Sequence, residues 1–384
     1  MISKSGYGYF SVLMIIILMV FSEYAGAQQT VTGSLLHNGL NRSYRLRLPA
    51  GHQTSVPIPL VFNLHGFTSN ATQQELYSGM NVIADTARFA VCYPNGVATS
   101  WNVGWSFGSQ ADDVGFISAL IEDLVARYGF DRSKIYACGM SNGGFMSFRL
   151  ACELSGKIAA IASVTGSIVP GGLQTCNPGK AVPVMTIHGT ADDVVPYNGG
   201  PINLPIENVV NFWTGLNGCE QNASVFDFPN INTADNSTAI KYTYDQCDEE
   251  SEVVFIKVTG GGHTWPGSLI NNGVTNRDFN ASAEIWRFFR RFSLPDLSSD
   301  KNLDETTLSY HVYPNPAIDE LNMKSTISFS QYEVVDITGK VIVSEKFSIP
   351  VIEFKIPLQQ LLPGLYFIRM GSSDLRATVK FVKI

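Results

Sequence analysis

The sequence has few charged residues and no cluster of lysine or arginine. Charged side chains make up 15 % of its 384 residues, and the formal net charge is -7 at pH 7. Proteins that bind nucleic acid need clustered basic side chains for their phosphate contacts. The composition therefore argues against a nucleic-acid partner and favours a neutral or small substrate. The hydrophobic share of 45 % is normal for a globular protein, so nothing indicates a chain that is disordered throughout.

Long apolar runs are also scarce, and the clearest one lies near the start of the chain. It extends from about Phe10 to Phe21, after Lys4, and is followed by the small residues Ala25–Ala27. The run is short for a bilayer span and ends in a small-x-small site, so residues 1–27 are predicted to be a secretory signal cleaved after Ala27. An uncleaved anchor is the alternative. No other stretch is apolar enough to span a membrane, so the mature chain is expected to have no stable membrane span.

Cysteine is infrequent, with six residues in the chain. Because export leads to an oxidising compartment, these cysteines are candidates for disulfides. Two of them bracket a compact segment and two others bracket a polar, Asn/Asp-rich segment, and the pairs predicted on this ground are Cys152–Cys176 and Cys219–Cys247. The sequence alone does not fix the connectivity. Cys92 and Cys138 lie in apolar strand-like runs, where free buried thiols are expected.

From about residue 30 to residue 292, short apolar runs of β type alternate with helical patterns. The β-type runs cover residues 44–48, 60–65, 89–94, 134–139, 158–164, 182–189 and 252–258. Between them, an apolar stripe predicts a helix from Asp113 to Tyr128, and a second helical pattern at residues 283–292 closes the domain. Continuous apolar strands separated by helices indicate an α/β fold with a mostly parallel sheet. Reactive groups in such folds gather at the carboxyl ends of the strands.

The composition changes after this region. Residues 293–307 are polar, contain proline and lack periodicity, which predicts a linker. Residues 308–384 contain β-type runs broken by Gly, Pro and Asp-Ile-Thr-Gly turns, which indicates a small C-terminal β-sandwich. The expected domains are therefore a signal peptide at 1–27, an α/β domain at 28–292, the linker, and the β-domain at 308–384.

Ser141 lies in the stretch Gly-Met-Ser-Asn-Gly-Gly, between an apolar run of strand type at 135–138 and a helix-like segment. Serine beside glycine and asparagine also occurs in ordinary turns, which is the alternative interpretation. The strand, turn and helix context favours a nucleophile at a strained apex, with Gly139 and Gly143 allowing the strand and the helix to pass closely.

A nucleophilic serine needs a base, and the base needs an acid. In folds with this kind of turn, the order along the chain is serine, acid, histidine. His37, His52 and His65 precede the serine, His188 leaves no room for an acid on a preceding strand end, and His311 falls in the C-terminal domain, so these five of the six histidines are excluded. His188 is expected to be structural. His263 remains, on the glycine-rich loop that follows the run 252–258, and it is the predicted base.

Two aspartates follow the run at 182–189 and are eligible as the acid. Asp192 is preferred over Asp193, because the turn after Gly189 ends at Asp192 and an apolar path then resumes. The other aspartate would be a cap or turn residue.

An oxyanion hole requires two donors aimed at the developing negative charge. The backbone N–H groups of Asn142, after the nucleophile, and of Phe67, after an early strand, are the candidates. The side chains of Trp101, Trp105 and Trp265 are candidates for a groove that binds aromatic or sugar rings, with plain packing as the alternative.

Several motifs together carry a family resemblance over residues 30 to 292. They are "LHGFTSN", "YPNG", "SWN", "DDVGFISALI", "GMSNGG", "HGTADDVVPY" and "GGGHTWPG". In this order they resemble secreted polyhydroxybutyrate depolymerase-like esterases, which are close kin of the feruloyl and acetylxylan esterases of carbohydrate esterase family 1. The resemblance implies an α/β-hydrolase fold, no metal, no cofactor, and a triad of Ser141, Asp192 and His263. It also implies that Asp113 orders the wall of the site. Phe67 departs from the family, because many members have a cysteine there, so no disulfide is expected at that position.

The tail from Tyr313 onward, with "YPNPAIDELNMKS", "DITGKVI" and "LPGLYFIRM", resembles the C-terminal sorting domain of the type IX secretion system of Bacteroidota. This resemblance implies a partnership with that machinery and passage across the outer membrane, rather than a substrate-binding module.

The sequence thus predicts a secreted serine carboxylesterase that acts on ester bonds of a polymer or its fragments. Polyhydroxybutyrate, feruloylated xylan and acetylxylan all require the same triad, so the substrate stays open. A non-catalytic binding protein on a hydrolase scaffold and a serine peptidase are the alternatives.

Overall fold

The computed structural model describes residues 28–270, 272–295, 310–336, 340–371 and 376–384. The chain forms two compact units, which divide between Pro295 and Asp296 and are described separately below. The predicted signal peptide and residues 296–307 of the predicted linker lie outside the described residues. Within the described ranges, no helix combines the length and the apolar character needed to cross a bilayer.

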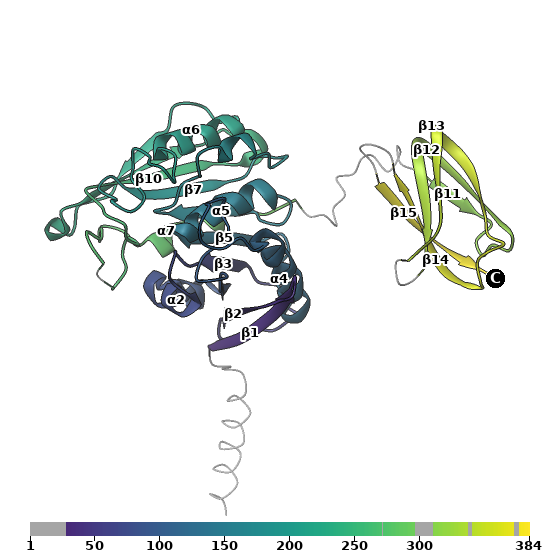
Figure 1. Ribbon diagram of the computed structural model, residues 1–384, viewed down its shortest axis with the longest axis horizontal. Coiled ribbons are helices and arrows are strands. Elements are labelled where there is room, and N and C mark those ends of the chain that lie inside the picture. The colour runs from purple at the N-terminus through teal and green to yellow at the C-terminus, as the bar shows by residue number, and fades with distance from the viewer. Residues whose placement is uncertain (1–27, 271, 296–309, 337–339, 372–375) are drawn as a thin grey trace, which may run out of the picture. The chain divides into compact units, whose positions relative to one another are not determined.

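The larger unit is built on a ten-stranded sheet (Figure 1) in the order β1-β2-β4-β3-β5-β6-β7-β10-β9-β8. The central strands run parallel and are β4 (Ala90–Pro94), β3 (Leu60–Leu64), β5 (Ile135–Met140), β6 (Ala160–Val164), β7 (Val184–Gly189) and β10 (Val253–Thr259). The edge strands pair antiparallel and are β1 (Gln29–His37), β2 (Leu40–Leu48), β9 (Thr238–Tyr244) and β8 (Ser224–Asp227). The predicted mostly parallel sheet is confirmed, and β1, β8 and β9 add strands that the sequence did not predict.

Helices cover both faces of this sheet. One face packs against α4 (Asp113–Tyr128), α5 (Asn142–Glu153) and α6 (Ile206–Leu216), and the other against α2 (Ala71–Ser78), α3 (Met80–Ala87) and α7 (Ala281–Phe289). Short 3-10 turns occupy Gly172–Gln174, Thr233–Asp235 and Asp248–Glu250. The predicted helix from Asp113 to Tyr128 has the same bounds as α4, because the Asp112 side chain accepts a hydrogen bond from Gly115 N at its start and Gly129 adopts a φ of 67° at its end.

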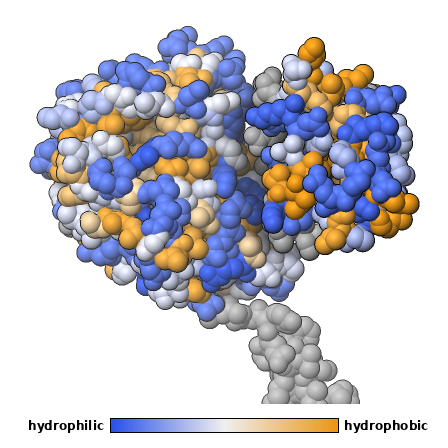
Figure 2. Space-filling view, turned by 45° about the vertical axis from the view of Figure 1, so that its right-hand side comes forward, coloured by the Kyte–Doolittle hydropathy of each residue, from blue (hydrophilic) through white to orange (hydrophobic). Residues whose placement is uncertain are grey.

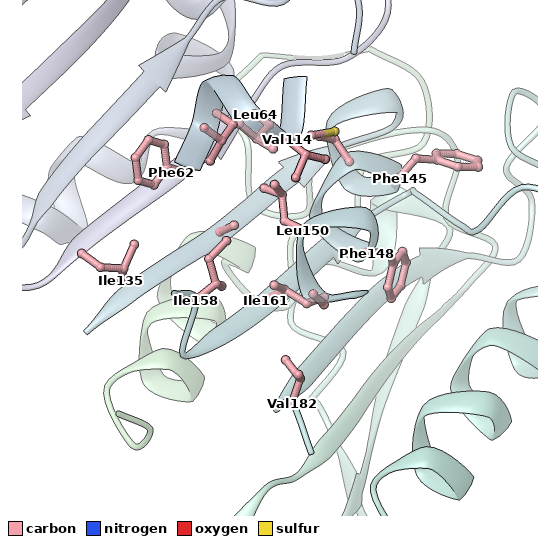
Figure 3. Close-up of a cluster of buried hydrophobic side chains, with 14 of the residues drawn as sticks. Phe62, Leu64, Val114, Ile135, Phe145, Phe148, Leu150, Ile158, Ile161 and Val182 are labelled. Atoms are coloured by element: carbon pink, nitrogen blue, oxygen red, sulfur yellow. The ribbon is translucent and has the colours of Figure 1, made fainter. Parts of the chain in front are cut away.

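Two hydrophobic layers result from the alternation of side chains along the buried strands. In β3, Leu60, Phe62 and Leu64 point to the layer under α4 and α5, whereas Val61 points to the opposite layer. Figure 3 shows part of the first layer, which includes Phe62 and Leu64 of β3 and Phe145, Phe148 and Leu150 of α5. Because both faces are covered, the central strands have no face exposed to solvent, which explains their mostly apolar sequence.

Both predicted disulfides are present. One joins Cys152 in α5 to Cys176 in the loop after β6, and the other joins Cys219 to Cys247, across 28 residues that contain the edge strands β8 and β9. Cys92 and Cys138 are buried and unpaired, as expected. Burial raises the pKa of both thiols, which keeps them protonated.

The smaller unit is an antiparallel five-stranded sheet that encloses its own core. Its strands are β11 (Tyr310–Tyr313), β12 (Glu320–Val335), β13 (Val341–Pro357), β14 (Gly364–Gly371) and β15 (Arg376–Lys383). The pairing of β12 with β13 shifts register near Phe329, which marks an irregularity in two long strands. The core contains Tyr332, Phe354 and Phe381 among its buried side chains.

On the face that Figure 2 shows, apolar side chains of the larger unit occur in separate patches between polar ones. Scattered exposed apolar residues of this kind are normal for a protein surface, so this view alone indicates no docking face.

Candidate active site

Ser141 lies at a strained turn between the central strand β5 and helix α5. Its φ of 54° and ψ of −120° are unusual for a residue with a side chain. Its N–H donates to Val164 O of the neighbouring strand at 2.9 Å. A Cβ atom on Gly143 would lie 2.2 Å from Leu64 O, so only glycine allows the helix to start this close to β3. The local sequence therefore folds into the sharp strand-to-helix turn that was predicted.

Asp192 follows β7 and is buried, whereas its neighbour Asp193 is exposed. The Oδ1 atom of Asp192 accepts hydrogen bonds from Val194 N at 2.9 Å and Val195 N at 2.8 Å. These two bonds fix the rotation of the carboxylate. They leave its Oδ2 atom free to contact a side chain from the next strand in the sheet.

His263 supplies that side chain from the loop after β10. Its Nδ1 atom lies 2.8 Å from Asp192 Oδ2. The glycines before it allow the loops after β7 and β10 to touch, because a Cβ on Gly189 would lie 2.2 Å from Gly261 O. Ala191 N donates to the same Gly261 carbonyl at 3.0 Å. The structure therefore brings Asp192, and not Asp193, to His263.

The charge state of Asp192 determines which nitrogen of His263 carries the proton. Burial acts to raise the pKa of Asp192, but the hydrogen bond and the charge of His263, with smaller contributions from His188 and Val195 N, lower the pKa overall. Asp192 is therefore a carboxylate at neutral pH and accepts a hydrogen bond from the Nδ1–H group of His263. The Nε2 atom of His263 is left without a proton, which is the form that a general base needs.

His188 is buried beside this pair. Its Nε2 atom donates to Val195 O at 2.9 Å and lies 3.4 Å from Asp192 Oδ2. Burial lowers the pKa of His188, so its ring is neutral. These contacts are those of a histidine that supports the Asp192 turn.

Ser141, Asp192 and His263 follow the parallel strands β5, β7 and β10, so they lie at the same carboxyl edge of the sheet. Ser141 and His263 are not joined by a hydrogen bond within the described residues. Contacts between a nucleophile and its base are often long until substrate binds.

The two candidate oxyanion donors lie close to this serine. Asn142 N begins helix α5, and Phe67 N follows Gly66, on which a Cβ would lie 3.5 Å from Ser141 Cβ. Within the part of the chain that the structure describes, neither N–H donates to a protein acceptor. Both groups are therefore available to a ligand at Ser141.

The prediction of tryptophans in a groove does not fit Trp101 and Trp265, whose side chains are 1 % and 0 % exposed. Their indole N–H groups donate inside the protein, to His65 O at 2.9 Å and to Ser282 Oγ at 3.2 Å. Both are packing residues, because a buried indole is stable where its N–H has a partner.

Trp105 is also mostly buried, but it supports an aromatic surface that the sequence did not predict. Its ring stacks on Phe107 at 5.0 Å between centroids and meets Phe67 edge-on at 6.3 Å. The side chains of Phe67 and Phe107 are 41 % and 44 % exposed. The only signal in the sequence is the phenylalanine that replaces the cysteine usual after His-Gly.

Potential metal ligands do not gather in the described residues, where no group of three or more histidine, cysteine, aspartate or glutamate side chains is arranged to hold an ion.

This sheet topology, with a strained serine after a central strand, is that of an α/β-hydrolase. A family model described as "Esterase PHB depolymerase" matches residues 42–199, and one described as "Secretion system C-terminal sorting domain" matches residues 311–384. The probable feruloyl esterase C of Aspergillus clavatus is 30% identical over 279 residues, which cover 70% of this chain and 90% of that protein. The putative esterase NocK of Nocardia uniformis subsp. tsuyamanensis is 32% identical over 250 residues, which cover 60% of this chain and 72% of that protein.

Other relatives are longer than the matched region. Feruloyl esterase B of Piromyces equi is 29% identical over 66% of this chain, and the match spans 46% of that protein, less than half of its length. Among solved structures, the acetyl xylan esterase from Aspergillus awamori aligns with a TM-score of 0.48 at 16% identity, covering 68% of this chain and 99% of that one. The chain belongs to the esterase family that includes polyhydroxybutyrate depolymerase-like and feruloyl esterases, and its C-terminal region is a type IX sorting domain.

Proposed function

We propose that this protein is a secreted serine carboxylesterase that works through an acyl-enzyme. The observation that carries the proposal is the 2.8 Å contact between Asp192 Oδ2 and His263 Nδ1, at the sheet edge where Ser141 lies on a strained turn. A carboxylate in this position holds the imidazole in the tautomer whose Nε2 atom can accept a proton. Membership of an esterase family supports the same chemistry.

In the proposed mechanism, Ser141 Oγ attacks the carbonyl carbon of the ester while His263 Nε2 takes the hydroxyl proton. The tetrahedral oxyanion accepts hydrogen bonds from the backbone N–H groups of Phe67 and Asn142. When it collapses, the carbon–oxygen bond to the alcohol breaks and His263 gives its proton to the leaving alcohol. Water then attacks the acyl-enzyme with His263 as base again, which releases the acid and restores Ser141.

The substrates we propose are esters of polymers or plant cell walls. The relatives named as feruloyl esterases, and a bifunctional acetylxylan esterase/xylanase of Neocallimastix patriciarum, support this class. The exposed rings of Phe67 and Phe107 offer an aromatic surface to a ring of the substrate. If the acyl group is aromatic, Phe107→Ala should raise KM for methyl ferulate more than for p-nitrophenyl acetate.

The test of the mechanism is p-nitrophenyl acetate hydrolysis by Ser141→Ala, with Ser224→Ala as a control on the exposed edge strand β8. Loss of the nucleophile should lower kcat by about 10⁴-fold or more while the circular dichroism spectrum stays unchanged. Turnover retained in Ser141→Ala would contradict the proposal. A parent protein that binds ester substrates without hydrolysing them would indicate a binding protein, and faster hydrolysis of peptide p-nitroanilides would indicate a peptidase.

The substrate test compares polyhydroxybutyrate film, methyl ferulate and acetylated xylan with the same enzyme preparation. The highest kcat/KM identifies the ester class. Hydrolysis of p-nitrophenyl acetate alone, with none of the three, would leave the esterase activity and contradict the proposed polymer substrates.

We also propose that the protein is exported, with residues 1–27 as a cleaved signal, 28–292 as the esterase domain, 293–307 as a linker and 308–384 as the sorting domain. The match of residues 311–384 to a secretion sorting domain supports this export. In a bacterium with a type IX system, the full chain should reach the medium or the cell surface with Gln28 as its first residue. A chain that ends at residue 307 should stay in the periplasm, and equal export of both chains would contradict the assignment.

A further inference from the structure

His65 is a buried histidine that the proposed mechanism does not use. It follows β3 directly, and its ring makes two hydrogen bonds with the backbone. Its Nε2 atom accepts from Gly96 N at 2.9 Å, and its Nδ1 atom lies 2.7 Å from Gly66 O. Because a backbone N–H can only donate, Nε2 must be unprotonated, and Nδ1 therefore carries the proton that Gly66 O accepts. Burial lowers the pKa of His65 to about 4, so the ring is neutral at neutral pH.

The bond to Gly66 O orients a peptide group of the candidate oxyanion hole. In a trans peptide, the C=O of one residue and the N–H of the next point in opposite directions. Holding Gly66 O against the His65 ring therefore turns Phe67 N–H away from that ring. Gly66 lies beside the nucleophile, since a Cβ on it would be 3.5 Å from Ser141 Cβ. Gly66 O also accepts from Ser69 N at 3.2 Å, so His65 and Ser69 together fix the direction of the first oxyanion donor, with the shorter bond from His65.

The second donor, Asn142 N–H, is held by residues 96–102, the segment whose first residue bonds to His65. The side chain of Asn142 is buried, accepts from Trp101 N at 2.6 Å and donates to Trp101 O at 3.2 Å. The indole of Trp101 donates in turn to His65 O at 2.9 Å. Residues 96–102, through Gly96 at one end and Trp101 near the other, therefore contact the supports of both donors.

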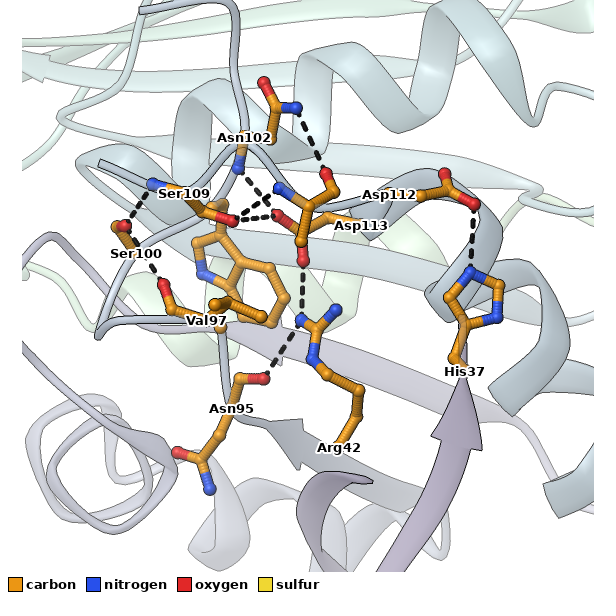
Figure 4. Close-up of polar contacts among 12 residues, drawn as sticks. His37, Arg42, Asn95, Val97, Ser100, Asn102, Ser109, Asp112 and Asp113 are labelled. Carbon is orange, nitrogen blue, oxygen red and sulfur yellow. Dashed lines mark hydrogen bonds and ion pairs between the residues drawn. The ribbon is translucent and has the colours of Figure 1, made fainter. Parts of the chain in front are cut away.

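This segment is anchored by a buried ion pair (Figure 4). Asp113 Oδ2 accepts from Asn102 N at 2.7 Å and from Ser109 Oγ at 3.1 Å, and Asp113 Oδ1 lies 2.5 Å from a guanidinium nitrogen of Arg42. Arg42 also donates to Asn95 O at 3.2 Å, just before the segment. These hydrogen bonds hold Asn95 and Asn102, so both ends of residues 96–102 are fixed.

We propose that His65 is a positioning residue. Through its bond to Gly66 O, it directs Phe67 N–H toward the oxyanion of the reaction. Through its bond to Gly96, it links this donor to residues 96–102, which also hold Asn142 N–H in place. His65 contacts neither the substrate nor the reacting atoms in this role. The inference rests on the proposed esterase mechanism, because an oxyanion hole has a purpose only if Ser141 attacks a carbonyl.

The test uses His65→Gln, which keeps an acceptor for Gly96 but loses the ring donor, and His65→Phe, which keeps the ring against Trp101 but loses both bonds. Active sites are counted by the burst of p-nitrophenol from p-nitrophenyl acetate. Per active site, kcat should fall at least tenfold in both variants while KM stays within twofold, because the oxyanion forms only after binding. The inhibition constant of an aryl trifluoromethyl ketone, which forms a tetrahedral adduct with the serine, should rise by the same factor.

A merely structural role would lower the number of titrated sites and leave kcat per site and the inhibition constant unchanged, and this result would overturn the proposal. The matched control is His52→Gln, because His52 also bonds a backbone carbonyl, Tyr128 O, but lies before β3 at the opposite edge of the sheet. The control should keep the parent's kcat. If the parent itself does not hydrolyse p-nitrophenyl acetate through Ser141, the proposed function fails, which is a different outcome.

A second measurement needs no variant at position 65. In ¹⁵N-histidine-labelled protein with His263→Ala, a neutral Nδ1–H ring should persist at pH 5. It is distinguishable from His52 and His188, which face backbone carbonyls through Nε2. Absence of a neutral Nδ1–H ring at pH 5 would overturn the inferred bond to Gly66.

Discussion

Replacing Asp192 by asparagine should hold His263 in the tautomer that cannot act as a base. Asp192 Oδ1 accepts from Val194 N and Val195 N, at 2.9 and 2.8 Å. In Asp192→Asn, the amide oxygen must occupy that position, since an amide NH₂ cannot accept from two N–H groups. The NH₂ group then faces His263 Nδ1, which has to accept rather than donate. The proton moves to Nε2, where it blocks the transfer from Ser141.

The magnitude follows from this wrong tautomer, which lowers kcat by about 10⁴-fold in enzymes with a serine, histidine and aspartate triad. Such a loss corresponds to about 5 kcal/mol of transition-state stabilisation. The assay is kcat and KM for p-nitrophenyl acetate, with circular dichroism and thermal unfolding to show that the variant folds. KM should change little, because the ground-state contacts of the ester are not altered.

The matched control is Asp193→Asn, which changes the exposed neighbour and should keep kcat within about twofold. If Asp192→Asn retains more than a tenth of the parent's kcat, the 2.8 Å contact does not fix the tautomer and the reasoning is refuted. If Asp193→Asn instead loses activity, the acid has been assigned to the wrong aspartate.

Three further predictions concern stability, each measured by denaturant unfolding. Asp113→Asn should lower the free energy of unfolding by about 3 kcal/mol, because it leaves the buried Arg42 unpaired. A loss below about 1 kcal/mol would mean that water already solvates the pair. Replacing Cys219 and Cys247 by serine should lower the free energy of unfolding by about 3.5 kcal/mol, because the disulfide closes a 28-residue loop. Unchanged stability would show that the loop is already ordered without the disulfide. His65 has a folded pKa of about 4, so the unfolded chain binds more protons between pH 6.5 and 4, and stability should fall by about 3 kcal/mol as the pH drops through this window. The free energy of unfolding should fall less steeply with pH in His65→Phe than in the parent. Equal slopes against pH in the two proteins would contradict the inferred neutral ring.

The sequence predicted the central sheet well because both of its faces are buried. Strands such as β4 and β5 are apolar throughout, and α4 has an apolar stripe with a cap at each end. The edge strand β8, from Ser224 to Asp227, is exposed along its whole length and carries no such pattern. It is a strand because β9 supplies hydrogen-bonding partners, which is information that a local pattern does not contain.

The positions of Ser141, Asp192 and His263 could be predicted from chain order and strand ends. The choice between Asp192 and Asp193 depends on a turn in which the Asp192 side chain accepts two N–H groups. A turn that ends at Asp192 was visible in the sequence, so the preference for this residue has a physical basis.

The surroundings of the site were harder to predict, because they depend on contacts between distant segments. Trp101 and Trp265 are buried, and their indole N–H groups bond to residues distant in the sequence, His65 and Ser282. The order along the chain excludes His65 as a base because it precedes the serine, but chain order says nothing about other roles. Its acceptor role depends on Gly96, 31 residues later, and no pattern in the sequence links the two.

The central claim is that Ser141 is the nucleophile, and the most direct measurement is the site of covalent labelling by a fluorophosphonate. The intact protein should gain one adduct, and peptide mapping by mass spectrometry should place it on Ser141. The Ser141→Ala variant, folded by circular dichroism, should gain none. An adduct on another residue, or labelling of Ser141→Ala at the parent's rate, would contradict the account.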